Sequence, residues 1–226
     1  MESNVETNTN VTKERKPSLF GMILNPGQQF ERMKQNPRIL VPLIIVSLMF
    51  LVSMSMAAIS MDIQVLMGTQ GTEGISEAEW EGMLLFTRIF MVIWGIVTAV
   101  LMVFIYSVLH LIVTKIAGSS VTFKQLFSMN TFIIFIGAIG ALLNYGIVMA
   151  IGGNSLFLMT SLAGVLNSDN MLLNSIELFA IWQMLLVGLG LHKVAGLSKG
   201  VAYTTAIVIY VIGLLIGNLG YLLGAL

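Results

Sequence analysis

The sequence predicts an all-α integral membrane protein with five transmembrane helices. Of its 226 residues, 57% are hydrophobic and 10% are charged, whereas a soluble domain carries about 25% charged residues. About 20 apolar residues suffice for a helix to cross a membrane. Five such runs occur, at about residues 39–61, 83–114, 125–150, 171–192 and 201–225. The runs are continuous rather than alternating, which disfavours a transmembrane β-barrel. The chain is therefore expected to contact the lipid bilayer.

The positions of the basic residues predict which side of the membrane each loop faces. Those outside the predicted spans occur only in segment 1–38, the second loop and the fourth loop: Lys13, Arg15, Lys16, Arg32, Lys34, Arg38, Lys115, Lys124, Lys193 and Lys199. The first loop is acidic instead, with Asp62, Glu73, Glu77, Glu79 and Glu81. Cytoplasmic loops retain Lys and Arg, so the N-terminus is expected in the cytoplasm and the C-terminus outside.

The chain divides into three predicted regions. Residues 1–16 are polar and are expected to form a disordered cytoplasmic tail. Residues 17–38 predict two short amphipathic helices in the membrane interface, the second starting with Asn25 as N-cap and Pro26 as first residue. Residues 39–226 form the membrane domain. The interfacial helices either anchor the bundle or dock a partner or anionic lipid.

Residues expected to contact a partner or lipid lie in these helices and in the basic loops. They are Phe20, Phe30, Arg32, Lys34, Arg38, Lys115, Lys124, Lys193 and Lys199. The second span is expected to begin at an N-cap on Ser76, with Glu79 completing a capping box, and to continue to Thr114. A helix of that length exceeds the bilayer thickness of about 30 Å. The third loop, 151–170, is expected to be a surface or re-entrant segment.

Two similar phrases predict a repeated helical hairpin. Residues 115–120 read KIAGSS and residues 193–198 read KVAGLS. Similar glycine-containing segments follow in the third and fifth spans, so spans 2–3 and 4–5 resemble two parallel copies. The alternative explanation is chance similarity, because a composition rich in Gly, Leu and Ile produces similar segments. Gly118 and Gly196 are expected to stop the preceding helices.

A line of small residues predicts close helix packing in the third and fifth spans. The residues are Gly137, Gly140, Gly213, Gly217, Gly220 and Gly224. In lipid, helices associate through close van der Waals contact, which small residues permit. Spans 3 and 5 are therefore expected to pack through these faces, against each other or against another subunit.

Two charged residues lie within the predicted spans, Arg88 and Glu177. Their similar distance from the outer ends of spans 2 and 4 predicts a structural ion pair. A proton or substrate pathway is the alternative, since an ionisable group within a membrane is a functional candidate. His110 and His192 lie near the cytoplasmic ends of spans 2 and 4, without cysteine or acidic neighbours. They are expected to bond to carbonyl groups rather than to a metal.

The sequence lacks the motifs of common enzyme classes. It contains no H-E-x-x-H or P-loop pattern, and its G-x-S-x-G match, residues 196–200, lies in a loop between two predicted spans rather than after a strand. The absence of cysteine excludes disulfides and thiol chemistry. We therefore expect a protein without catalytic residues, cofactor, metal or nucleic-acid partner.

Three stretches together resemble the Yip domain, over residues 19–220. They are residues 24–46, 110–132 and 181–209, whose carrying features are Asn25-Pro26 with Phe30, Gly118 with Phe123-Lys124-Gln125, and Trp182 with Gly196-Leu197-Ser198-Lys199. Many family members carry a proline in the third span, where this chain has Phe135-Ile136-Gly137. The resemblance implies a five-span membrane protein with a cytoplasmic N-terminus, of a family named for interaction with Ypt/Rab GTPases. The short N-terminus suggests the bacterial branch, in the cytoplasmic membrane.

The resemblance implies an adaptor rather than an enzyme. Bacterial members are expected to assist ABC-type exporters or resistance to toxins and membrane stress, so the predicted partner is a membrane protein such as an exporter subunit. One alternative is a small transporter or channel that uses Arg88 and Glu177. Another is a protein that handles lipid or shapes the membrane. The sequence does not set the oligomeric state.

Overall fold

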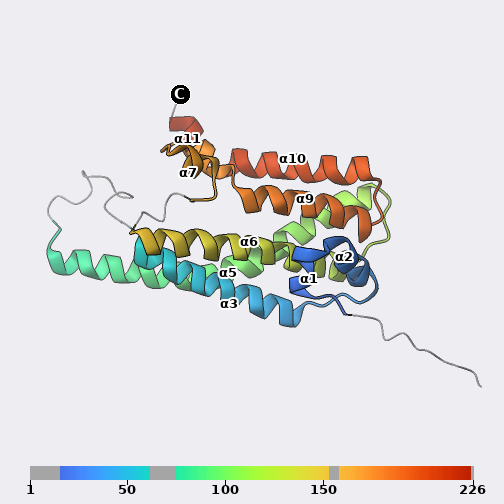
Figure 1. Cartoon of the computed structure of the whole chain (residues 1–226), viewed down its shortest axis with the longest axis horizontal. Helices are drawn as coiled ribbons and strands as arrows, with labels where there is room; N and C mark the ends of the chain where they lie inside the picture. Colours follow the sequence, from blue (N-terminus) through green and yellow to red (C-terminus); the bar gives the residue numbers. More distant parts are fainter. Residues whose placement is uncertain (1–15, 62–74, 153–157, 225–226) are drawn as a thin grey trace, which may run out of the picture.

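The computed structural model describes residues 16–61, 75–152 and 158–224. The predicted disordered tail lies almost wholly outside these residues, as do Asp62 and Glu73. Within them the chain is helical, with one isolated β-bridge between Ser161 and Glu177. The long helices run side by side along one direction (Figure 1). The predicted all-α class is confirmed.

Four helices of the described chain are long and apolar enough to cross a membrane. They are α3 (Leu40–Ser60), α5 (Glu77–Ile116), α6 (Phe123–Ile151) and α10 (Lys199–Gly217). The predicted fourth span is instead divided into α8 (Met171–Ser175) and α9 (Leu178–Lys193). Ile176 and Glu177 between them have extended backbones, and the bridge to Ser161 holds that conformation. The single helix predicted over 171–192 is therefore wrong.

The predicted fifth span is also divided. α10 ends at Gly217, and α11 (Leu219–Gly224) turns away from it after Asn218 (Figure 1). The Asn218 amide donates to the Ser175 hydroxyl at 2.8 Å and to the Leu214 carbonyl at 2.8 Å. The two interruptions are thus joined by a side-chain hydrogen bond.

Helix α6 lies at the centre of the bundle. It packs against α3, α5 and α9, and its buried side chains include Phe132 and Ile136. The hairpin of α9 and α10 joins the bundle through α9, and α10 packs chiefly on α9. The outer side of α10 is not covered by the described residues, since Ile212 and Leu215 are each about half exposed.

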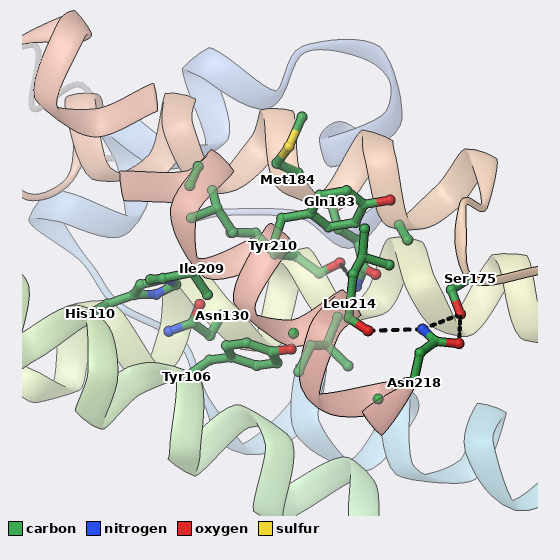
Figure 2. A pocket seen from close by; sticks show the side chains of 17 residues that line it. Tyr106, His110, Asn130, Ser175, Gln183, Met184, Ile209, Tyr210, Leu214 and Asn218 are labelled. Carbon is green, nitrogen blue, oxygen red and sulfur yellow. Dashed lines mark hydrogen bonds between the residues drawn. The ribbon is translucent and has the colours of Figure 1, made fainter. Parts of the chain in front are cut away.

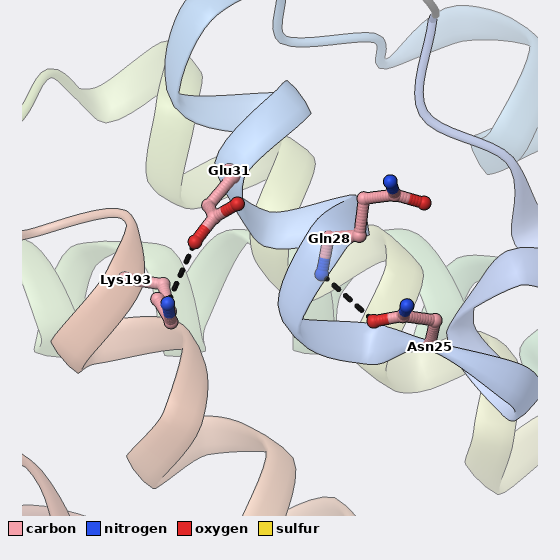
Figure 3. Close-up of polar contacts among 4 residues, drawn as sticks. All are labelled: Asn25, Gln28, Glu31 and Lys193. Carbon is pink, nitrogen blue, oxygen red and sulfur yellow. Dashed lines mark hydrogen bonds and ion pairs between the residues drawn. The ribbon is translucent and has the colours of Figure 1, made fainter.

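The short N-terminal helices follow the sequence prediction in their boundaries. α1 spans Leu19–Leu24 and α2 spans Pro26–Gln35. The Asn25 side chain caps α2 by accepting the Gln28 amide hydrogen at 3.2 Å (Figure 3). Pro26 suits the first helical position because it has no amide hydrogen to satisfy. α2 packs against α6 and α9.

The predicted start of α5 and its turn are confirmed. Ser76 accepts the Glu79 amide hydrogen, while the Glu79 carboxylate accepts the Ser76 amide hydrogen at 2.9 Å. α5 ends at Ile116 and is followed by the left-handed Gly118, with φ of 75°, as α9 is followed by Gly196, with φ of 73°. Both hairpins turn at the same end of the bundle (Figure 1), as a parallel repeat requires, although their helices differ in length. Duplication itself stays a prediction.

The third loop contributes α7 (Leu162–Leu166). Residues 153–157 of that loop lie outside the described chain. The described remainder packs back onto the bundle, with α7 against α8. The expected surface or re-entrant segment is thus a short folded cover over the interruption before α9.

Candidate functional site

The first candidate feature is the end of the bundle where both hairpins turn, which we call the basic end. It carries exposed or half-buried cationic side chains from α2 and its flank, and from the two turns: Arg32, Lys34, Arg38, Lys115, Lys124, Lys193 and Lys199. The first turns of α5, with Glu77, Glu79 and Glu81, lie at the opposite end (Figure 1). The bundle is therefore electrically polarised along its length.

Hydrogen bonds between distant segments hold the basic end together. The Ser119 hydroxyl in the first turn donates to the Ala195 carbonyl in the second at 2.6 Å. The Gln125 amide donates to the Lys34 carbonyl at 2.6 Å. The Ser128 hydroxyl donates to the Arg38 carbonyl at 2.7 Å. These contacts fix the positions from which the cationic side chains extend.

An ion pair joins α2 to the end of α9. Lys193 Nζ donates to Glu31 Oε1 at 2.6 Å (Figure 3). It is the salt bridge found among the described residues. The ammonium group holds the pKa of the Glu31 carboxyl below its usual value by hydrogen bonding and by charge. Both side chains are solvent-accessible, so the pair contributes little stability.

The two aromatic residues predicted to contact a partner have opposite environments. Phe20 is 76% exposed, whereas Phe30 is fully buried. A Cβ added to Gly190 would lie 3.3 Å from the Phe30 ring, so Phe30 packs directly against α9. The prediction that Phe30 contacts a partner is therefore wrong, because the apolar side of α2 faces α9 rather than lipid.

The predicted ion pair of Arg88 and Glu177 is also wrong in this structure. Arg88 Nε donates to the Ala58 carbonyl at 3.0 Å, in the last turn of α3. Glu177 caps α9, accepting the Ala180 amide hydrogen at 2.8 Å. A cation suits the carbonyl end of a helix and an anion suits the amide end. Each charge is thus matched to a helix terminus instead of to the other charge.

Substitution of these two residues should therefore have additive effects. We expect Arg88→Gln and Glu177→Gln each to lower the free energy of unfolding by about 0.5–2 kcal/mol, since each weakens a helix terminus. The double variant should show the sum within about 0.5 kcal/mol, as for independent sites. Thermal unfolding in detergent measures all four proteins. If the double variant were no less stable than Glu177→Gln alone, the result would support the predicted ion pair and contradict independent roles.

Glu177 belongs to a buried network that the sequence did not indicate. The Thr160 hydroxyl donates to the Glu177 carboxylate. The Asn144 side chain of α6 donates to that hydroxyl at 2.7 Å and accepts the Thr160 amide hydrogen at 2.9 Å. Glu177 is 8% exposed and Asn144 is 2% exposed. The network joins α6, the third loop and α9.

The predicted glycine faces divide between packed and open positions. A Cβ on Gly140 would lie 2.5 Å from Phe179 Cγ, and one on Gly137 would lie 2.6 Å from Gln183 Nε2. Close packing of α6 is therefore confirmed, but its neighbour is α9. Cβ atoms on Gly213, Gly217 and Gly220 would meet nothing within 4 Å. Gly224 ends α11. Packing of span 3 against span 5 through glycines is thus wrong.

The second candidate feature is a cavity of about 300 Å³ between α10, α9 and the α5–α6 hairpin. We call it the hairpin cavity. Apolar side chains such as Ile133, Val187 and Leu214 form much of its wall. Figure 2 shows polar side chains reaching it from each wall, with His110 at one end and Asn218 at the other. The open glycines Gly213 and Gly217 belong to its α10 wall.

Two polar groups in the cavity wall lack partners. His110 has no exposed surface, and neither ring nitrogen meets the geometry of a hydrogen bond among the described residues, although the Asn130 side chain lies close to the ring. The Tyr210 hydroxyl is likewise buried and without a partner there. His192, by contrast, donates from Nδ1 to the Leu197 carbonyl at 2.7 Å. The expectation of a carbonyl partner is therefore confirmed for His192 and wrong for His110.

The cavity residues escaped the sequence prediction for a simple reason. Tyr106, Asn130, Gln183 and Tyr210 are uncharged and isolated within apolar runs. What identifies them is that four helices bring them to one space, which no local pattern records. The described residues contain no cluster of three or more metal-ligating side chains.

Comparison with known proteins agrees with this architecture. The family model of the Yip1 domain matches residues 20–219. The chain is 34% identical over 213 residues to "Membrane protein YknW" of Bacillus subtilis (strain 168), covering 93% of this chain and 92% of that protein. No solved structure matches. The predicted location in a bacterial cell membrane agrees with this relative and with the apolar helices. The chain belongs to the Yip1 domain family.

Proposed function

We propose that the chain is a non-enzymatic membrane adaptor that binds another integral membrane protein through the basic end. In this proposal the basic end faces the cytoplasm, because Lys and Arg are retained on that side. The partner is an ABC-type exporter subunit with an acidic cytoplasmic segment. The observation that carries the proposal is the gathering of cationic side chains from separate segments on one fixed surface.

Charge and rigidity both support binding at this surface. Lys34, Lys115, Lys124 and Lys199 are exposed, and the one acidic side chain seen among them, Glu31, pairs with Lys193. An uncompensated surface of one sign steers a partner of opposite sign and fixes its orientation. Phe20 adds an exposed aromatic side chain on the neighbouring helix α1, beside Phe135, of the type that often anchors interfaces.

The transporter alternative has lost its main support. Its pathway was expected to use Arg88 and Glu177, which the structure directs to separate helix termini. Among the residues that line the hairpin cavity there is no Lys, Arg, Asp or Glu. Transport of an ion through this cavity would therefore lack a charged side chain to replace the ion's hydration.

The proposal is tested by cross-linking in native membranes. A photoreactive amino acid replaces Phe20 in the test protein. In the control protein it replaces Phe86, which is 71% exposed and lies in the half of α5 away from the basic end. We expect Phe20 to give one stoichiometric cross-link to an exporter subunit. The double variant Lys115→Glu with Lys199→Glu should lower its yield about tenfold, because the attraction becomes repulsion. Mass spectrometry identifies and quantifies the product.

Matched controls separate charge from general damage. Glu81→Lys reverses a charge at the opposite end and should leave the yield unchanged. The chain has no cysteine, so single substitutions Ser119→Cys and Ser76→Cys report orientation with an impermeant maleimide on intact cells. Labelling at Ser119→Cys, equal cross-linking from Phe86, or an unchanged yield after charge reversal would each contradict the proposal.

A further inference from the structure

We infer that the hairpin cavity binds an uncharged lipid, whose hydroxyl and ester groups bond separately to His110 and Tyr210 while one hydrocarbon chain lies along α10. The inference does not depend on the adaptor function. It concerns a different part of the molecule, between the α9–α10 hairpin and the α5–α6 hairpin (Figure 2).

Unsatisfied polar groups indicate that the cavity receives a ligand. A buried donor or acceptor without a partner costs about 1–3 kcal/mol, so such groups call for an explanation. His110 is fully buried, and neither its ring nitrogens nor the Tyr210 hydroxyl makes a geometrically complete hydrogen bond among the described residues, although the Asn130 side chain lies close to the imidazole. Other polar groups nearby are satisfied: the Gln183 amide donates to the Ile133 carbonyl at 3.2 Å, and the Asn130 amide to the Ser107 hydroxyl at 3.0 Å.

The chemistry of the wall selects an uncharged ligand. A neutral imidazole offers one donor and one acceptor, and a tyrosine hydroxyl offers both. Hydroxyl and ester groups complement such a pair. No Lys or Arg lines the cavity to neutralise a phosphate, and no Asp or Glu lines it to pair with an amine. Burial of an unpaired charge there would carry a large desolvation cost.

The size and shape of the cavity select one hydrocarbon chain rather than a helix. The wall of α10 runs from Ala206 to Gly217, a length of about 17 Å at the usual rise. A helix of that length is about 10 Å across with its side chains. The cavity holds about 300 Å³, at the small end of pockets that bind small molecules. A partner's helix is therefore too wide, whereas an extended chain suits the long, mostly apolar space.

The open glycines explain how a chain lies against α10. Cβ atoms on Gly213 and Gly217 would meet nothing within 4 Å, although both residues line the cavity. The missing side chains leave room beside the helix backbone. The cavity is partly open rather than enclosed, so a lipid can enter it without unfolding the bundle.

The inference is tested with photoactivatable lipids on the purified full chain in nanodiscs. The probes are a diacylglycerol, a phosphatidic acid and a phosphatidylglycerol with the same reactive acyl chain. We expect diacylglycerol to label peptides of α9 and α10, with competition by unlabelled diacylglycerol. His110→Leu and Tyr210→Phe should each lower that labelling about fivefold, as expected for one lost hydrogen bond.

Matched glycine variants locate the lipid. Gly213→Leu fills the cavity and should abolish the labelling, whereas Gly220→Leu, an equally open glycine outside the cavity wall, should not change it. Labelling that is uniform over exposed helices and insensitive to Gly213→Leu would mean surface lipid only. Stronger labelling by the phosphate-bearing probes, or a partner helix cross-linked at Gly213 with no lipid labelling, would also overturn the inference. Partner capture through Phe20 is scored separately, so either proposal can fail alone.

Discussion

Gly140→Ala is expected to lower the free energy of unfolding by about 1–3 kcal/mol, the usual cost of overfilling a packed interface. The added Cβ would lie 2.5 Å from Phe179 Cγ and 2.7 Å from Phe179 Cβ. These atoms are near the α9 backbone, so a rotation of the ring tip cannot relieve the contact. Either α6 and α9 separate or Phe179 leaves its position. A lower thermal unfolding midpoint in detergent measures the effect.

Gly213→Ala is the matched control on the other glycine face. Its Cβ would meet nothing within 4 Å, and alanine favours a helix over glycine by about 1 kcal/mol. We expect an unchanged or higher midpoint. A loss at Gly213 equal to that at Gly140 would show that α10 packs against another helix there, as the sequence predicted. No loss at Gly140 would contradict the packed α6–α9 contact.

Asn144→Leu is expected to cost about 3 kcal/mol, because it leaves a buried amide hydrogen without an acceptor. Asn144 accepts the Thr160 amide hydrogen at 2.9 Å and donates to the Thr160 hydroxyl at 2.7 Å. Leucine can replace neither bond. The Thr160 hydroxyl in turn donates to Glu177, so its orientation toward the carboxylate is also weakened. The unfolding midpoint again gives the measurement.

Two substitutions at Thr160 separate the hydroxyl from the volume of the side chain. Thr160→Ser keeps the hydroxyl and should remain close to the parent in stability. Thr160→Val keeps the shape and removes the donor to Glu177, so its midpoint should fall. If Thr160→Val has the same unfolding midpoint as the parent, or Asn144→Leu does not lower that midpoint, the network does not stabilise the fold.

The features predicted correctly from the sequence depend on neighbours a few residues apart. The capping box of Ser76 and Glu79, the cap of α2 by Asn25, and the left-handed Gly118 each involve one turn of chain. Their partners are close in sequence, so residue type and spacing predict them. The apolar runs likewise predict long helices, because length and hydropathy are sums along the chain.

The features that were missed depend on direction around a helix axis or on distant partners. Arg88 and Glu177 lie at similar predicted depths, but depth does not say which neighbour a side chain faces. Glycines look alike in sequence whether a helix covers them, as at Gly140, or open space does, as at Gly217. The interruption before α9 arises from the distant Ser161. Apolar composition alone does not reveal it.

The same limit applies to the candidate sites. The basic end was largely predicted, because charge sorting is a property of loops that sequence displays directly. Phe30 was misplaced, since an amphipathic helix shows the same pattern whether its apolar side faces lipid or protein. The hairpin cavity was not predicted at all. Single polar residues such as Gln183 and Tyr210 become a group only when the helices assemble.

The burial of α2 against α9 has a consequence for the order in which the protein is made. Phe30, near the beginning of the chain, lies against Gly190, which the ribosome adds much later. Chains emerge from the N-terminus onward. α3, α5 and α6 can therefore assemble during synthesis, whereas the surface that buries α2 is complete only after α9 has been made. One of the first segments to be translated is among the last to be locked in place.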